Sequence, residues 1–155
     1  MATDPALYRV VLDTNVLVSG TIVTQGPSAA ILAAWREGRF ILLMSVWQRA
    51  ELARVLVRPR IVRKYQLTED RVAAFFLLVD TLATPVEPLR TLPLAVRDPQ
   101  DVPILGMALA GRATHIVTGD DDLLTLRGDP ALGGVRIVTP RVFIDDLSEE
   151  GEGDA

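Results

Sequence analysis

The sequence predicts a single α/β domain with a central, mainly parallel sheet flanked by helices. One observation is the length, since 155 residues is the usual size of one domain. Another is that short, continuous apolar runs alternate with helical patterns, which is typical of a parallel sheet covered on both faces. A third is that no linker long enough to separate two domains interrupts the alternation. We therefore expect one domain over residues 1–147 and a flexible acidic tail over residues 148–155.

The first predicted elements are two strands with a helix between them. Residues 8–12 (YRVVL) form a short, mostly apolar run that predicts a buried strand. Residues 28–38 (SAAILAAWREG) predict a helix, because Pro27 precedes them and a glycine ends them. Residues 40–43 (FILL) predict the second strand.

A second helix follows directly. Ser45 suits its N-cap, and Gln48 stands three residues later, which is the spacing of a capping box. The pattern runs to about Val57, before Pro59. Its apolar residues fall near one stripe that leaves the arginines off it: Val46, Leu52, Val55 and Leu56.

The second half of the chain continues the alternation. Residues 68–82 predict a helix whose acidic first turn suits the helix dipole, and residues 83–97 predict a connection with a short strand near 85–87. Asp98-Pro99-Gln100-Asp101 predicts a helix start with Asp98 as the N-cap, and this helix should end near Gly111.

The last predicted elements are two strands and a helix. Residues 115–118 and 135–138 predict the strands, and Thr139-Pro140 predicts the start of the final helix.

The composition excludes several kinds of chemistry. The chain has no cysteine, which removes disulfides, thiol nucleophiles and cysteine zinc sites and fits the reducing cytoplasm that we expect. Its single histidine, His115, leaves no histidine pair for a metal, and we expect it to be structural. We also expect no membrane segment, because no apolar run reaches ~18 residues. Metal-binding and acid–base chemistry therefore fall mostly to carboxylates.

Several carboxylates stand where a parallel sheet would bring them together. Asp13 follows the first strand and Asp120 follows the strand at 115–118, and the carboxyl ends of parallel strands meet at one edge of a sheet. Asp101, in the first turn of its helix, starts from the same edge, and Glu51 lies about two turns into the helix opened by Ser45. Clustered carboxylates repel one another unless a divalent cation neutralises them, and an all-oxygen site suits Mg²⁺ or Mn²⁺. Such a site serves metal-assisted attack of water on a phosphodiester, with one ion or two.

Each acid also has a structural explanation. Asp98 and Asp101 can simply cap a helix, and the run from Asp120 to Asp122 can form a turn followed by another N-cap. Glu51 can pair with an arginine on a solvent-facing helix. Asp13 is the hardest to explain in this way, because it directly follows an apolar run.

Four blocks of the sequence, taken in order, resemble the PIN-domain nucleases. The opening block is VVLDTNVLVSG, and the block of the second acid is SVWQRAELARVLVRPRIVRKY. The third and fourth blocks are contained in DPQDVPILGMALAGRATHIVTGDDDLL, which ends on the pattern T-x-D-x-D. The resemblance runs from Tyr8 to about Leu147 and is closest to the bacterial VapC-like toxins of toxin–antitoxin systems. Its one noted departure is Leu123, where a phenylalanine is common.

The resemblance implies a three-layer PIN-like fold and a Mg²⁺- or Mn²⁺-dependent endoribonuclease. The acids that it makes catalytic and metal-binding are Asp13, Glu51, Asp101 and Asp120. It adds Asp122 to the metal ligands and Asp98 as an auxiliary acid. Asn15, Ser19 and Thr118 would orient the carboxylates through hydrogen bonds.

The resemblance also implies partners. Such toxins often form homodimers and are held inactive by a small cognate antitoxin that covers or enters the acidic groove. With a net charge of −4, the molecule as a whole does not attract nucleic acid electrostatically, but basic residues are concentrated in one stretch. Four arginines there are candidates to hold an RNA backbone: Arg49, Arg54, Arg58 and Arg60. The alternative is that they form an ordinary solvated helix face.

Two rival functions remain to be compared. A haloacid-dehalogenase-like phosphatase would also begin with a strand-terminal aspartate, but its motif is D-x-D, and Asn15 stands at the second acid position here. Lys64, the only lysine, lies on an arginine-rich stretch rather than at a strand edge. The other rival is a catalytically inactive PIN-like module that binds RNA or protein, and the complete set of acids argues against it.

Overall fold

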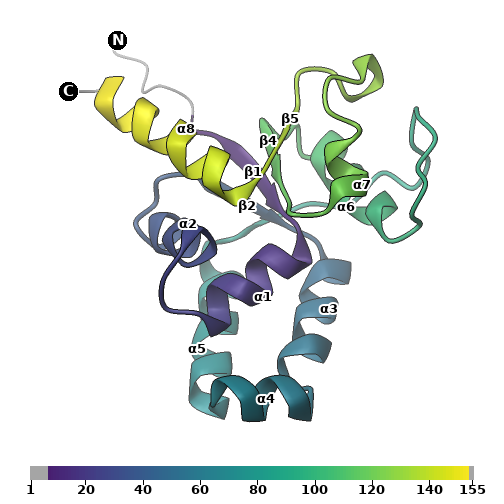
Figure 1. Ribbon diagram of the computed structural model, residues 1–155. Helices are drawn as coiled ribbons and strands as arrows, with labels where there is room; N and C mark the ends of the chain where they lie inside the picture. The colour runs from purple at the N-terminus through teal and green to yellow at the C-terminus, as the bar shows by residue number, and fades with distance from the viewer. Residues whose placement is uncertain (1–6, 154–155) are drawn as a thin grey trace.

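The computed structural model describes residues 7–153, which form a parallel sheet covered by helices on both faces (Figure 1). In chain order the elements are β1 Arg9–Leu12, α1 Thr14–Ile22, α2 Pro27–Arg36, β2 Ile41–Met44, α3 Val46–Leu56, α4 Pro59–Tyr65, α5 Glu69–Leu82, β3 Thr84–Pro85, α6 Asp101–Ala110, β4 His115–Val117, α7 Asp121–Leu124, a 3-10 helix Pro130–Leu132, β5 Arg136–Val138 and α8 Pro140–Gly153. The predicted three-layer α/β architecture is confirmed, with all five strands parallel.

The strand order places β1 at the centre of the sheet. The order is β3-β2-β1-β4-β5, so β1 has β2 on one side and β4 on the other. Val10 is in register with Leu42 of β2 and with His115 of β4. The ends of β1 and β4 are therefore neighbours at the carboxyl edge of the sheet, although they lie far apart in the sequence.

Successive residues of the central strand enter two different cores. Val10 and Leu12 pack in a core with side chains of α1, α2, α3, α5 and α8, whereas Val11 packs with side chains of α6 and α7 on the other face. All three side chains are 0% exposed. Because both faces are covered, β1 cannot shift its register without burying the wrong side chains, and this fixes the position of its carboxyl end.

The predicted cap at Ser45 is present, and Thr68 forms a second cap that was not predicted. The Ser45 side chain accepts a hydrogen bond from the backbone N–H of Gln48 at the start of α3, and Thr68 accepts one from Arg71 at the start of α5. Helix α3 ends at Leu56, and Pro59 opens a further short helix, α4. Figure 1 shows α3, α4 and α5 forming an arm beside the sheet. Arg49 of α3 and Asp80 of α5 form a two-pronged ion pair across this arm, with N–O distances of 2.6 and 2.7 Å.

Some local predictions are wrong. Val46 does not join the apolar stripe of α3, because its side chain is 88% exposed, while Leu52 and Leu56 are fully buried. Helix α6 begins at Asp101 rather than just after Asp98. Asp98 instead closes the turn before the helix, where its Oδ1 accepts from the N–H of Gln100 and its carbonyl accepts from the N–H of Asp101.

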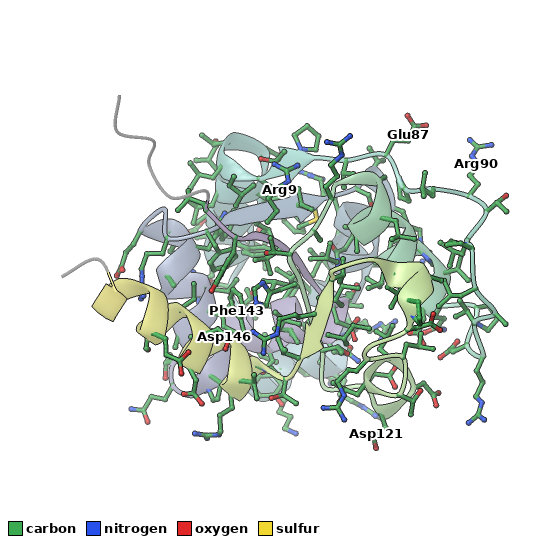
Figure 2. The ribbon with its side chains drawn as sticks, turned by 90° about the horizontal axis from the view of Figure 1, so that it is seen from above. Arg9, Glu87, Arg90, Asp121, Phe143 and Asp146 are labelled. Carbon is green, nitrogen blue, oxygen red and sulfur yellow. The ribbon has the colours of Figure 1, made fainter. Side chains whose placement is uncertain are left out.

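The last helix is longer than the predicted domain. Helix α8 continues to Gly153, so the expected boundary after Leu147 falls inside a helix, and residues 154–155 of the expected tail lie outside the described residues. Phe143 and Asp146 lie on the side of α8 that faces the sheet (Figure 2). His115, which is 3% exposed, contacts Asp146 at 3.3 Å and packs against the rings of Tyr8 and Phe143, as expected of a structural residue.

Among the described residues, no single helix is both long and apolar enough to cross a bilayer, although α1 and α2, bent by 89°, pass that test as a pair.

Candidate metal centre

The four acids predicted to be catalytic line one pocket. It has a volume of about 470 Å³ and lies where the carboxyl ends of β1 and β4 meet the first turn of α6 and the inner side of α3. Asp13, Glu51, Asp101 and Asp120 contribute to its wall, together with Asp98 and the amide of Asn15. Five carboxylates therefore face one cavity from four separate segments of the chain.

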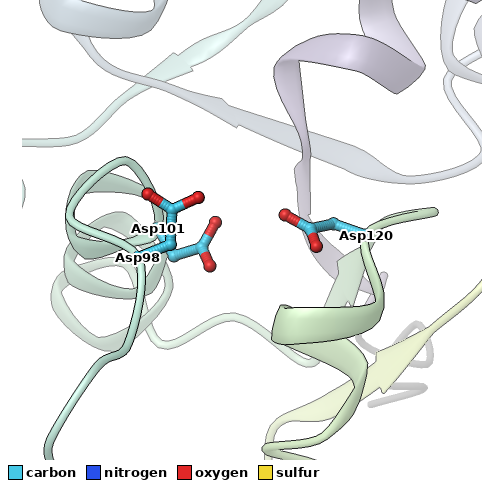
Figure 3. Close-up of side chains that lie close together, drawn as sticks. All are labelled: Asp98, Asp101 and Asp120. Atoms are coloured by element: carbon cyan, nitrogen blue, oxygen red, sulfur yellow. The ribbon is translucent and has the colours of Figure 1, made fainter.

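Three of these carboxylates are especially close. Asp98, Asp101 and Asp120 each offer an oxygen atom, and these atoms all lie within 4.8 Å of one another. Figure 3 shows Asp98 and Asp101 at the start of α6 facing Asp120 across the pocket. Asp98 reaches the cluster because the turn before α6 holds its backbone beside the helix start. The acid predicted as auxiliary is thus part of the tightest group.

Asp13 is held in place by the neighbouring strand. Its backbone N–H donates to the carbonyl of Val117, and its Oδ2 accepts a hydrogen bond of 2.7 Å from the Thr118 hydroxyl. Burial raises the pKa of Asp13 above its usual value. The Thr118 hydrogen bond opposes this change, and the negative charge of Asp120 adds to it. Thr118 therefore orients a carboxylate, as the resemblance implied.

Among the acids of the cluster, Asp101 has the most strongly raised pKa. Only 5% of the residue is exposed. Burial, followed by the charges of Asp120, Asp98 and Asp13, raises its pKa to about 7. With this pKa, the carboxyl group of Asp101 is partly protonated near neutral pH, whereas an ordinary aspartate is fully ionised there.

Glu51 faces the same pocket from α3 and has a partner. Arg54, one turn further along the helix, forms an ion pair with it, and the Glu51 side chain is 25% exposed. The ion pair fits the structural explanation of Glu51, and the paired carboxylate also lines the cavity. It is not part of the close group of three acids.

Other predicted residues lie at different distances from the pocket. Arg54 and Arg58 line it, whereas Arg49 is engaged with Asp80 and Arg60 lies on the first turn of α4. Within the described part of the chain, Ser19 and Asp122 are not among the residues that line this cavity. Asp122 lines a smaller pocket next to it, together with Asp101.

Gln48 has a structural role different from the capping box that its spacing predicted. Its side chain does not turn back to its own helix start, but is 0% exposed and donates from Nε2 to the carbonyl of Leu12 over 2.6 Å. This bond joins α3, which carries Glu51, to the residue before Asp13. No sequence signal distinguishes this use from a capping box, because both need a glutamine at the same position.

The chemistry of the donors fits a divalent cation. All of the clustered ligands are carboxylate oxygens, which Mg²⁺ and Mn²⁺ prefer. A cation among them would relieve the repulsion that raises the pKa of Asp101, and Thr118 already holds one of the acids in a fixed orientation. The residues Asp98, Asp101, Asp120 and Asp13 are therefore suited to hold the metal.

Comparison with known proteins supplies a family. A family model described as the PIN domain matches residues 9–122, which is well over half of the chain and includes every acid of the pocket. No curated protein matches the sequence.

Proposed function

The chain belongs to the PIN-domain family, whose members are generally nucleases, and on this premise we propose that it is a Mg²⁺- or Mn²⁺-dependent endoribonuclease. The observation that carries the proposal is the approach of Asp98, Asp101 and Asp120 to within 4.8 Å in a pocket that Asp13 and Glu51 also line. An inactive module would have no need to maintain this cluster, because its mutual repulsion costs stability.

The metal would be held by Asp13, Asp101 and Asp120, with Asp98 beside them. When bound, it supplies positive charge that activates water and stabilises the phosphate as negative charge develops on it. Thr118 keeps Asp13 directed into the pocket, and the helix start at Asp101 keeps that carboxylate opposite Asp120. The main contribution of the protein is therefore a rigid set of acids on two adjacent strand ends and one helix start.

The RNA backbone would lie along the basic side of the pocket. Arg54 and Arg58 line the cavity on the side of α3, and the side chain of Arg54 is 64% exposed. Exposed guanidinium groups bind phosphates in a salt-dependent manner without reading the sequence. Arg60 extends this surface onto α4, while Arg49 is better explained by its ion pair with Asp80.

We also propose that the protein acts in the cytoplasm as the toxin of a toxin–antitoxin pair and that it works as a homodimer. Support comes from the order of the four sequence blocks and from the exposed acidic cavity, which a small antitoxin could enter. A housekeeping role in RNA processing would use the same site. A small gene next to this one, encoding a DNA-binding N-terminus, would favour the toxin role.

Cleavage of RNA tests the proposed enzyme. We expect the protein to cut RNA with Mg²⁺ or Mn²⁺ and to lose this activity with a chelator or in Asp13→Asn. Activity that persists without metal, or a fully active Asp13→Asn protein, would contradict the mechanism.

Charge reversal of Arg58 and Arg60 should weaken RNA binding without changing metal binding, and unchanged RNA affinity would remove the basic surface from the proposal.

A further inference from the structure

A second, smaller pocket adjoins the metal centre. It has a volume of about 240 Å³ and is formed by the end of the β3–α6 connection, the start of α6 and the residues in and after α7. Its principal lining residues are Val96, Arg97, Asp101, Asp122, Thr125 and Leu126. We propose that this pocket binds one nucleobase of the substrate, that of a nucleotide next to the scissile phosphate. The proposal rests on the proposed ribonuclease function.

The position of the pocket follows from Asp101. This residue lines both the main cavity and the smaller pocket, so the two are separated by the width of one side chain in the metal centre. A phosphodiester held at the cluster must continue into a nucleotide on each side. The main cavity, with Arg54 and Arg58, receives one side of the substrate, and the smaller pocket receives a base from the other.

The walls of the pocket suit a flat ring. Val96 and Leu126 are partly buried apolar side chains at the margin of the core beneath α6, and they give the pocket an apolar floor. The side chain of Arg97 is 88% exposed, and its contact with Asp122, at 3.9 Å, is at the limit of an ion pair. A guanidinium that is held so weakly is available to stack on a base. Unstacked RNA bases are commonly bound between such groups.

The size and charge of the pocket limit the kinds of ligand that it can bind. A cavity of roughly 150 Å³ accommodates benzene, so about 240 Å³ suffices for one nucleobase. Asp122 and Asp101 make the pocket unfavourable for a phosphate group. The carboxylate of Asp122 is 42% exposed and can accept hydrogen bonds from an exocyclic amino group, which adenine, cytosine and guanine carry and uracil lacks. The pocket should therefore prefer a base with an amino group, such as adenine, cytosine or guanine, over uracil.

Binding of modified RNA tests this pocket independently of catalysis. Single-stranded RNAs in which one nucleotide at a time is abasic are titrated by fluorescence anisotropy with Mg²⁺, in an Asp13→Asn background to prevent cleavage. We expect one position at which loss of the base weakens binding about tenfold. At that position adenine, cytosine or guanine should bind several-fold more tightly than uracil.

Variants of the pocket assign that position to it. Arg97→Gln, at an exposed residue, and Leu126→Trp, which fills the pocket, should each weaken binding of intact RNA and abolish the penalty for the abasic nucleotide. Arg90→Gln is the matched control, because Arg90 lies on the same connection and projects away from the rest of the molecule (Figure 2). It should leave both quantities unchanged. A penalty that persists unchanged in Arg97→Gln and Leu126→Trp would overturn the proposal.

The outcomes separate this inference from the function on which it rests. If the wild-type protein cleaves RNA but no abasic position depends on Arg97, the base pocket is wrong and the nuclease proposal stands. If base-dependent binding requires Arg97 but the wild-type protein never cleaves RNA, the pocket is a binding site and the nuclease proposal fails. If neither the wild-type protein nor the Asp13→Asn protein binds RNA, the base pocket and the nuclease proposal are both refuted.

Discussion

The hydroxyl of Thr118 connects the two central strands at the point where their acids begin. Its Oγ1 donates to Oδ2 of Asp13 over 2.7 Å and accepts the backbone N–H of Asp120 at 2.9 Å. One fully buried side chain thus fixes a carboxylate that lies 105 residues earlier in the chain and the backbone of another two residues later. Asp13 and Asp120 are thus both held through the same hydroxyl.

Replacing Thr118 by valine should weaken metal binding. The change keeps the shape of the buried side chain but removes both hydrogen bonds, so Asp13 loses its fixed orientation. Loss of such a supporting partner typically lowers metal affinity at least about tenfold. Isothermal titration with Mn²⁺ measures the effect, and Thr118→Ser, which keeps the hydroxyl, is the control. Equal affinities of the valine variant and the wild type would show that Asp13 is held by other contacts.

Removing the charge of Asp101 should stabilise the metal-free protein at alkaline pH. Its pKa in the folded protein, about 7, is above the usual 3.8, so folding favours the protonated form. The resulting stabilisation is complete below about pH 4 and is lost as the pH rises through 7. At pH 8 with chelator, Asp101→Asn should therefore raise the free energy of unfolding by about 1–2 kcal/mol, a value reduced for solvent screening in the open pocket.

The control for this measurement is Asp121→Asn. Asp121 is exposed and projects away from the rest of the molecule (Figure 2), so its effect should stay within about 0.5 kcal/mol. Urea denaturation at pH 5 and pH 8 gives both values, and the advantage of Asp101→Asn should shrink at pH 5. Destabilisation of that variant at pH 8 would mean that the carboxylate is needed for the fold itself.

Metal affinity should fall in acid. Protons compete with the cation for Asp101, whose pKa is about 7, so the affinity for Mn²⁺ should begin to decrease below neutral pH. Well below pH 7 the loss approaches about tenfold for each pH unit from this one group. Titration calorimetry between pH 8 and pH 5.5 at constant ionic strength tests the expectation. In Asp101→Asn the affinity should be lower throughout and less dependent on pH; an identical pH dependence would assign the proton to another acid.

Gly106 should be intolerant of a side chain. A Cβ atom at this position of α6 would lie 2.5 Å from the backbone carbonyl oxygen of Leu89, so the connection that carries Asp98 would have to move. Such overpacking costs about 1–3 kcal/mol. Chemical denaturation of Gly106→Ala gives the value, and Gly134→Ala is the control, since no atom lies within 4 Å of its added Cβ. Equal stability of the two variants would show that the connection yields easily.

The sequence predicted the strands and the Ser45 cap well because their signals are local. The strands at β1 and β2 are short apolar runs, and Ser45 acts through a backbone N–H three residues away. Helix α1 was not predicted, because it is buried on most sides and its residues (TNVLVSGTI) show almost no polar face. Asp98 was misplaced as a cap, because Asp-Pro also suits a turn that precedes a helix.

The site was only partly predictable for a physical reason. The carboxyl ends of parallel strands share one edge of the sheet, and this rule predicted that Asp13, Asp101 and Asp120 lie close together. Sequence patterns do not reveal which strands are adjacent or how a turn bends. The closeness of Asp98 to the cluster, the position of Asp122 in a neighbouring pocket and the reach of Gln48 to Leu12 all depend on tertiary packing.

The central position of β1 also has a consequence for protein synthesis. Asp13 is translated before its partners Asp101, Thr118 and Asp120, which come more than eighty residues later, and β4 must dock beside β1 before they meet. A nascent chain therefore has no complete acidic centre until Asp120 has left the ribosome and β4 has docked beside β1.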